Sequence, residues 1–186
     1  MNGTVGNSPH PYENLRDAVI MMVDDEPILM EIVQAFLEEE GYANFVLVDD
    51  SSTALERVEQ ERPDVLLLDL VMPKVDGFDI LKAVRANPLH QHLPVIVLTS
   101  SGESATKLRA LELGATDFLA KPVDASELAL RLRNTLTAKA YQDQLAYYDA
   151  LTGLPNRKLF LDRLEWGLRR SVREGKSLAV MTIGLD

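Results

Sequence analysis

The chain has 186 residues, of which 46% are hydrophobic and 26% charged, a net charge of -10 and no cysteine. This composition fits one globular domain plus a shorter remainder, and it excludes a disulfide scaffold, a thiolate metal site and a cysteine nucleophile. The acidic charge argues against binding to nucleic acid or to an anionic membrane, and no apolar run is long enough to span a bilayer.

The N-terminal residues 1–17 are polar and rich in Gly, Asn and Pro. They lack the basic start and the apolar run of a secretory signal. We therefore expect a flexible N-terminal tail on a cytoplasmic protein.

From residue 18 onward, short apolar runs alternate with amphipathic ones. The apolar runs predict five strands: Ala18–Val23, Phe45–Val48, Val65–Leu68, Val95–Leu98 and Thr116–Ala120. Helices are predicted between them, the first opened by Pro27 and stopped by Gly41, and the third over Gly77–Arg85. The second, fourth and fifth helices begin at capping boxes: Thr53-x-x-Glu56, Ser100-x-x-Glu103 and Asp124-x-x-Glu127.

Five strand–helix repeats of this kind predict an α/β fold with a five-stranded parallel sheet, doubly wound, so that helices cover both faces. The strands are nearly all apolar, as expected when both faces are buried. Ligands of such a sheet bind at the carboxyl ends of the strands. The residues at those ends are therefore the candidate site.

Four of the five strand ends are expected to bring polar side chains to one edge of the sheet. Asp24 and Asp25 end the first strand, Asp69 the third, Thr99 the fourth and Lys121 the fifth. A single aspartate after a strand is commonplace and usually caps a helix. Four strand ends that meet at one edge are a much stronger indication of a site.

Three carboxylates within a few ångströms repel one another, by about 4 kcal/mol per pair at about 4 Å and an effective dielectric of about 20. Hard oxygen ligands without His or Cys fit Mg²⁺. With such an ion bound, Asp69 becomes a plausible nucleophile toward a phosphoryl group. Lys121 could pair with the phosphate, and Thr99 could donate its hydroxyl to a phosphoryl oxygen. His90 and the other two histidines are interpreted as solvated, and Gly77 as a turn residue.

Four motifs at these strand ends resemble the response-regulator receiver domain. They are Val23-Asp24-Asp25-Glu26-Pro27, Leu68-Asp69-Leu70-Val71-Met72-Pro73, Leu98-Thr99-Ser100 and Ala120-Lys121-Pro122. The resemblance covers about residues 18–138 and implies a flavodoxin-like fold.

The resemblance also implies a role for each site residue. Asp69 is then the phosphoacceptor, and Mg²⁺ is held by Asp25, Asp69 and the backbone carbonyl of Val71, with Asp24 acting through water. Lys121 pairs with the phosphoryl group, and the Lys121–Pro122 peptide is cis. On phosphorylation Thr99 moves toward the phosphate and Phe118 turns into the vacated space, which reshapes the face of helix four, strand five and helix five.

The last predicted helix does not stop where the receiver resemblance ends. Apolar residues recur at three- and four-residue steps through Leu145 and Tyr148, which predicts a linker helix over residues 139–148. This stripe could pair two copies of the chain through the 124–148 helix, or it could simply pack on the next domain. The face of helix four, strand five and helix five is a second candidate surface for a homodimer.

At residue 149 a second motif begins. Asp149-Ala150-Leu151-Thr152-Gly153-Leu154-Pro155-Asn156-Arg157 resembles the entry of a GGDEF domain, the fold of diguanylate cyclases. Residues 149–186 cover only an incomplete start, before the GGDEF loop itself. Gly184-Leu185-Asp186 stands where active cyclases usually have Asp-x-Asp, so the resemblance implies a degenerate domain linked to cyclic-di-GMP signalling. One helix and the predicted strand Leu178–Ile183 are too few to form a core.

The leading hypothesis is a two-component response regulator, not an enzyme, that accepts a phosphoryl group from a sensor histidine kinase or a phosphotransfer protein. One alternative is a Mg²⁺-dependent phosphohydrolase with an aspartate nucleophile. Another is a docking scaffold that is never phosphorylated.

Overall fold

The structure is a computed structural model, and it describes residues 15–100 and 104–184. The expected tail therefore lies almost entirely outside the described residues, apart from a short 3-10 turn, η1 (Leu15–Asp17). The chain divides into two compact units, residues 1–140 and 141–186, and each is described by itself.

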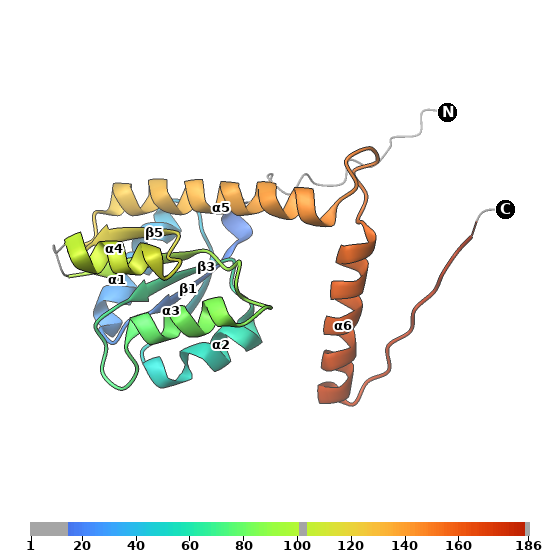
Figure 1. The fold of residues 1–186 in the computed structure, drawn as a ribbon, viewed down its shortest axis with the longest axis horizontal. Helices are drawn as coiled ribbons and strands as arrows, with labels where there is room; N and C mark the ends of the chain where they lie inside the picture. The colour runs from blue at the N-terminus through green and yellow to red at the C-terminus, as the bar shows by residue number, and fades with distance from the viewer. Residues whose placement is uncertain (1–14, 101–103, 185–186) are drawn as a thin grey trace. The chain divides into compact units, whose positions relative to one another are not determined.

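The first unit is built on a sheet of five parallel strands in the order β2-β1-β3-β4-β5. The strands are β1 (Val19–Val23), β2 (Asn44–Val48), β3 (Val65–Asp69), β4 (Val95–Thr99) and β5 (Asp117–Ala120). The helices that connect and follow them are α1 (Pro27–Glu39), α2 (Ala54–Glu61), α3 (Gly77–Ala86), α4 (Ser104–Glu112) and α5 (Ala125–Tyr147) (Figure 1). The predicted α/β fold with a doubly wound parallel sheet is confirmed.

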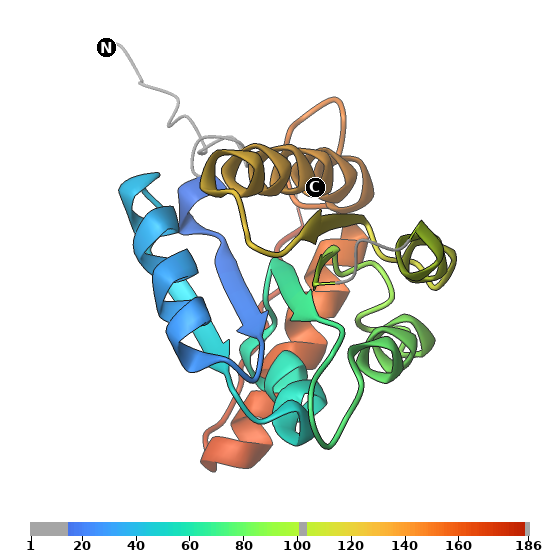
Figure 2. The ribbon, with the colours of Figure 1, turned by 90° about the vertical axis from the view of Figure 1, so that its left-hand side faces the viewer.

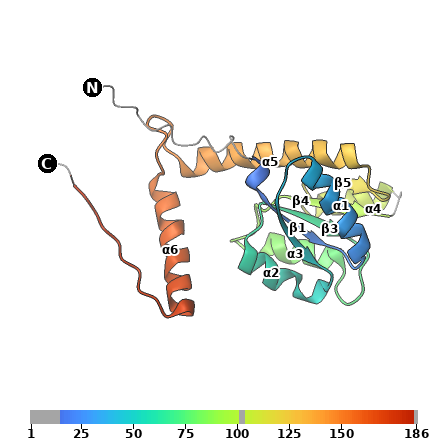
Figure 3. The same ribbon diagram turned by 180° about the vertical axis from the view of Figure 1, so that it is seen from behind.

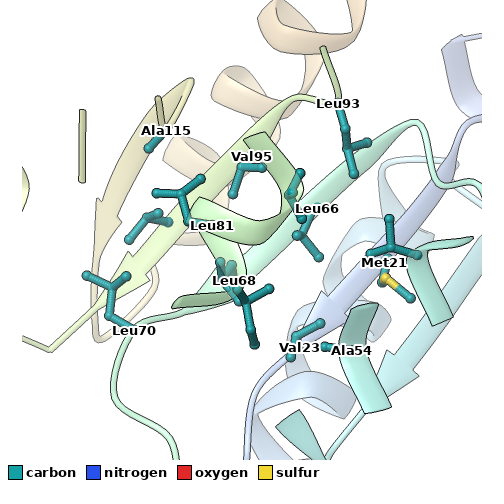
Figure 4. Close-up of a cluster of buried hydrophobic side chains, with 14 of the residues drawn as sticks. Met21, Val23, Ala54, Leu66, Leu68, Leu70, Leu81, Leu93, Val95 and Ala115 are labelled. Atoms are coloured by element: carbon teal, nitrogen blue, oxygen red, sulfur yellow. The ribbon is translucent and has the colours of Figure 1, made fainter. Parts of the chain in front are cut away.

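Helices cover the sheet on both faces, with α1 and α5 on one face and α2, α3 and α4 on the other (Figure 2). Alternate residues of a strand serve opposite faces. Thus Met21 and Val23 of β1 pack toward α2 and α3, and Ile20 and Met22 pack toward α1 and α5. Figure 4 shows the buried cluster that contains Met21 and Val23. Burial on both faces explains why the strands read as continuous apolar runs.

The ends of the helices follow local sequence signals. Gly41, with φ of +93°, ends α1 as predicted, and Gly114, also with φ of +93°, ends α4. Asp124 caps α5 by accepting a hydrogen bond from the Glu127 amide at 2.8 Å. The predicted cap formed by Ser100 and Glu103 depends on residue 103, which lies outside the described residues.

The capping box predicted at Thr53 is wrong. The Thr53 hydroxyl donates to the Asp50 carbonyl at 2.9 Å and caps no amide of α2. A 3-10 turn, η2 (Ser51–Thr53), leads into the helix, and the carboxylate of Asp50 accepts from the Ser52 amide instead. The turn already gives Thr53 helical backbone angles, which turn its side chain away from the N-cap position.

The second unit contains the last turns of α5, a turn, and α6 (Arg157–Glu174). Asn156 caps the start of α6, and Gly175, with φ of +64°, ends it. The strand predicted over Leu178–Ile183 is not observed: the segment is extended, but it pairs with no strand in the described part of the chain (Figure 3). A strand needs a hydrogen-bonding neighbour, and apolar composition alone does not supply one.

No described side chain from residue 141 to residue 184 is buried. Val172 is 84% exposed and Phe160 is 50% exposed. The expectation that this segment forms no core of its own is confirmed.

Within the described ranges, no helix is both long and apolar enough to cross a membrane.

Candidate functional site

Three carboxylates meet at the carboxyl edge of the sheet. Oxygen atoms of Asp24, Asp25 and Asp69 all lie within 4.8 Å of one another. The register of the central strands produces this arrangement, because Val23 of β1 pairs with Leu68 of β3 and the chain continues from both into the aspartates. Asp24 and Asp69 are buried, at 1% and 4% exposure, and Asp25 is the most exposed of the three.

Lys121 reaches the same cluster from the end of β5. Its ammonium donates a hydrogen bond to Oδ2 of Asp69 at 2.7 Å and lies 2.8 Å from Oδ2 of Asp24. Glu26 is farther away, at 3.5 Å. The backbone amide of Lys121 donates to the carbonyl of Thr99 at 2.8 Å, so β4 and β5 present both residues at one edge. The peptide bond between Lys121 and Pro122 is cis.

The charges at this edge influence one another strongly. Burial raises the pKa of Asp24, although Lys121 and the Glu26 amide oppose that effect. Burial alone would lower the pKa of Lys121, but hydrogen bonds and attraction from Asp24 and Asp69 outweigh it and raise that pKa overall. The ammonium therefore stays charged and holds the two buried aspartates together.

The residues present fit a divalent cation. One ammonium faces three carboxylates, so the cluster keeps an excess of negative charge. The buried Oδ2 of Asp24 receives no hydrogen bond of good geometry from the described residues, although Lys121 is near. All the available donors are oxygens, which is the ligand set of Mg²⁺. Asp25, Asp69 and Asp24 could together hold such an ion.

Residues that follow β2 hold the loop after β3 in place. No role was assigned to the end of β2 from the sequence alone. The hydroxyl of Ser51 donates to the Pro73 carbonyl at 2.6 Å and accepts from the Val75 amide at 3.1 Å. Asp50 pairs with Lys74 at 2.7 Å, and this contact contributes to lowering the pKa of Asp50 to about 2. The signal available in the sequence was the Asp-Asp-Ser-Ser run directly after the strand.

Gly77 is more than a turn residue. A Cβ atom at this position would lie 2.1 Å from the carbonyl oxygen of Asp69 and 2.7 Å from the Cα of Leu70. The amide of Gly77 donates to the Leu70 carbonyl at 3.0 Å. The start of α3 therefore approaches the backbone of Asp69 so closely that only glycine fits.

Phe118 lies half-buried on β5, between two cations. The ammonium of Lys107 on α4 is 5.0 Å from its ring centre, and the guanidinium of Arg131 on α5 is 6.0 Å away. Arg131 is itself held by Asp117 at 2.6 Å and by Glu127 at 2.6 Å. Sequence reasoning selected Phe118 but neither cation, because a helical Lys or Arg carries no signal of what it covers.

The interpretation of His90 as a solvated residue is wrong. His90 is half-buried beside a pocket between α2 and α3, and its Nε2 is fully buried without a hydrogen-bond partner among the described residues. Burial lowers its pKa, an effect that Glu59 opposes and Arg62 reinforces. The local sequence, Pro-Leu-His-Gln-His, gave no sign that one histidine packs inward and the other does not.

Two family descriptions match this chain. Residues 20–133 match the family described as Response regulator receiver domain. Residues 146–186 match the family described as Diguanylate cyclase, GGDEF domain. The first match covers the sheet, except Val19, and its carboxyl edge, and the second begins at the end of α5.

The sequences of named response regulators align with much of this chain. Response regulator Rre1 from Synechocystis is 36% identical over 117 residues, covering 63% of this chain and 51% of that protein. Response regulator PleD from Caulobacter vibrioides is 32% identical over 171 residues, covering 84% of this chain and 37% of that protein. The chain thus spans about half, or less, of the length of these two relatives.

Solved structures agree on the fold of the first unit. A putative response regulator from Chloroflexus aurantiacus superposes with a TM-score of 0.62 at 33% identity, covering 65% of this chain and 98% of that one. Chemotaxis protein CheY4 from Vibrio cholerae superposes with a TM-score of 0.60 at 29% identity, covering 64% and 98%. The first unit therefore has the same fold as these two solved chains over nearly their whole length.

Proposed function

Because the chain belongs to the response regulator receiver family and continues into the start of a GGDEF domain, we propose that it accepts a phosphoryl group on Asp69 and passes this signal to an output region. The observation that carries the proposal is the contact between Asp69 and Lys121 at 2.7 Å inside a buried acidic cluster. The phosphodonor is a phosphohistidine of a sensor kinase or of a phosphotransfer protein.

In the proposed reaction, a carboxylate oxygen of Asp69 attacks phosphorus, a P–O bond forms, and the P–N bond to the donor imidazole breaks. The imidazole nitrogen keeps the bonding electron pair and takes up a proton. The charge on the phosphoryl oxygens would be met by the Lys121 ammonium, which already lies beside the nucleophile. Burial of Asp69 limits the access of water to the acyl phosphate that results.

Mg²⁺ is the proposed cofactor, held by Asp25, Asp69 and the carbonyl of Val71, with Asp24 acting through water. Bound there, the ion would supply neutralising charge and polarise the phosphoryl group. The amide of Val71 already donates to Oδ1 of Asp69 at 3.2 Å, so the loop and the nucleophile are fixed together. This contact keeps Val71 beside the nucleophile, where its carbonyl would contribute a ligand.

The proposed switch is a coupled movement of Thr99 and Phe118. Thr99 is buried at 1% exposure next to the cluster, and Phe118 lies in the following strand in contact with cations from α4 and α5. A phosphoryl group would attract the Thr99 hydroxyl, and Phe118 would turn inward behind it. The face formed by α4, β5 and α5 would change, because Lys107 and Arg131 would no longer contact the Phe118 ring.

The test is phosphorylation of the full chain by acetyl phosphate with Mg²⁺, followed by separation of the phosphorylated form on a phosphate-binding gel. The Asp69→Asn variant should give no phosphorylated form. Asp49→Asn is the matched control, since Asp49 also follows a strand but is exposed and outside the cluster. Phosphorylation that persists in Asp69→Asn would refute the assignment.

The same experiment separates the two alternatives. A phosphohydrolase would release phosphate from esters over many turnovers, whereas the proposed switch gives one long-lived adduct per chain. A scaffold that is never phosphorylated would give no adduct at all. A signalling assay in which Asp69→Asn behaves like the unaltered protein would also favour the scaffold.

For the remaining parts of the chain, we propose a receiver over residues 18–138, a linker helix over 139–148 and an incomplete GGDEF start over 149–186, in a cytoplasmic protein. We also propose that the output is linked to cyclic-di-GMP and that the GGDEF start is degenerate, because Gly184 offers no side chain as a metal ligand.

Homodimerisation through the 124–148 helix is supported by two exposed apolar residues on α5, Tyr141 at 57% and Leu145 at 84%. The face of α4, β5 and α5 is the second candidate surface.

A further inference from the structure

Hydrogen bonds from a single residue close the turn between α5 and α6. The Nδ2 of Asn156 donates to the Ala146 carbonyl at 2.9 Å, and its backbone amide donates to the Tyr147 carbonyl at 2.8 Å. The Oδ1 of the same side chain accepts from the Leu159 amide at 3.1 Å. Asn156 therefore binds the last turn of α5 and the first turn of α6 at the same time.

Both helix ends need such partners. The last carbonyls of α5 and the first amides of α6 have no partner inside their own helices. A primary amide offers donors on one side and an acceptor on the other, so one asparagine can satisfy both ends. Aspartate could still cap α6 through its oxygen, but it has no hydrogen to give to Ala146.

The rest of the turn is also fixed by hydrogen bonds. Asp149 donates its amide to the Leu154 carbonyl at 2.8 Å, and its carboxylate accepts from the amide and hydroxyl of Thr152 at 2.9 and 2.8 Å. Gly153, with φ of +66°, donates its amide to the Asp149 carbonyl at 2.9 Å. The turn is therefore an ordered loop rather than a flexible linker.

We propose that Asn156 is a positioning residue that makes the turn a rigid joint between the end of α5 and the start of α6. A displacement of the end of α5 would then move α6, instead of being absorbed by the turn. This inference concerns the joint alone, so it holds whether or not Asp69 is the phosphoacceptor. The transmission of a movement from α5 to α6 would then depend on Asn156.

The test uses the absence of cysteine in the chain. Cysteines introduced as Gln142→Cys on α5 and Arg173→Cys on α6 replace exposed residues and accept spin labels at those two positions only. The distance distribution between the labels is measured by pulsed electron paramagnetic resonance in the full chain. Helix content is followed by circular dichroism on the same samples.

In the parent chain we expect a narrow distance distribution with a small broad fraction from chains in which the joint is open. Asn156→Asp keeps the acceptor that caps α6 but removes the donor to Ala146, so helix content should stay while the broad, open fraction rises about fivefold, the effect of losing one hydrogen bond. Asn156→Ala loses both contacts and should also lose helix content. Asn134→Asp, an exposed site on α5, is the control for the added charge and should stay narrow.

A narrow distribution in Asn156→Asp would overturn the proposal and reduce Asn156 to an ordinary helix cap. If Asn156→Asp loses helix content, Asn156→Ser decides the question, since its hydroxyl caps α6 but is too short to reach Ala146 as well. A broad distribution in Asn156→Ser with intact helices supports the joint. A narrow one overturns it.

Discussion

The two units of this chain obtain their structure in different ways. The first buries both faces of a five-stranded sheet under helices, and its strands β3 and β4 are buried at every position. The second has well-formed helix caps at Asn156 and Gly175, yet none of its described side chains is buried. Local signals can therefore specify where a helix begins and ends without providing a core, because a core requires several elements to share apolar surface.

The largest expected effect tests this comparison with matched leucines. Leu67→Ala, at a fully buried position of β3, should lower the free energy of unfolding by about 2–5 kcal/mol. Leu161→Ala, at a position of α6 that is 45% exposed, should change it by less than about 0.5 kcal/mol. Urea unfolding followed by circular dichroism measures both. Similar losses in the two variants would show that α6 has a buried partner.

The next effect compares two glycines. Gly77→Ala would place a Cβ against the Asp69 backbone, so it should destabilise the first unit by about 1–3 kcal/mol and slow acetyl phosphate labelling of Asp69. Gly153→Ala meets no atom within 4 Å and strains only the positive φ, which costs about 1 kcal/mol without affecting labelling. Labelling rates decide between them, and equal rates in both variants would contradict the close approach at Gly77.

A smaller effect concerns the acidic cluster. Millimolar Mg²⁺ should raise the melting temperature of the first unit by roughly 4 °C for each kcal/mol that it adds to the free energy of unfolding, because the ion relieves repulsion among the carboxylates. Asp25→Asn should reduce this shift, whereas Asp162→Asn on α6 should leave it intact. Differential scanning calorimetry with and without Mg²⁺ gives the answer. An unchanged shift in Asp25→Asn would remove Asp25 from the ligand set.

The smallest effect is a pH dependence caused by His90. Burial lowers the pKa of His90 in the folded state below its ordinary value of about 6.5. The contribution of neutral His90 to the free energy of unfolding is therefore complete above about pH 6.5. It is lost as the pH falls from there toward the folded-state pKa, because the unfolded chain takes up the proton first. The loss should be small, because a single partly buried imidazole causes it. His90→Gln should flatten that part of the stability curve, and exposed His92→Gln should not. Urea midpoints between pH 7 and pH 5 provide the measurement.

Much of the site could be predicted because parallel strands bring their carboxyl ends to one edge. Asp24, Asp69 and Lys121 could be placed together from their positions after apolar runs, and the structure brings the Lys121 ammonium within 2.8 Å of both carboxylates. Gly77, Ser51 and the cations around Phe118 were not identified. Each depends on a contact between segments that the order of residues does not reveal.

The sequence by itself determined the helices and strands of the first unit, their order, the parallel sheet and the carboxylates at its edge, because each depends on local periodicity, helix caps or chain order. Only the tertiary structure decided that Gly77 must be glycine, that His90 packs inward and that Asn156 contacts two helices. It also decided that residues 178–183 form no strand, since pairing needs a neighbour that composition cannot guarantee. These outcomes depend on distances between atoms far apart in the chain or across a turn, which no local pattern encodes.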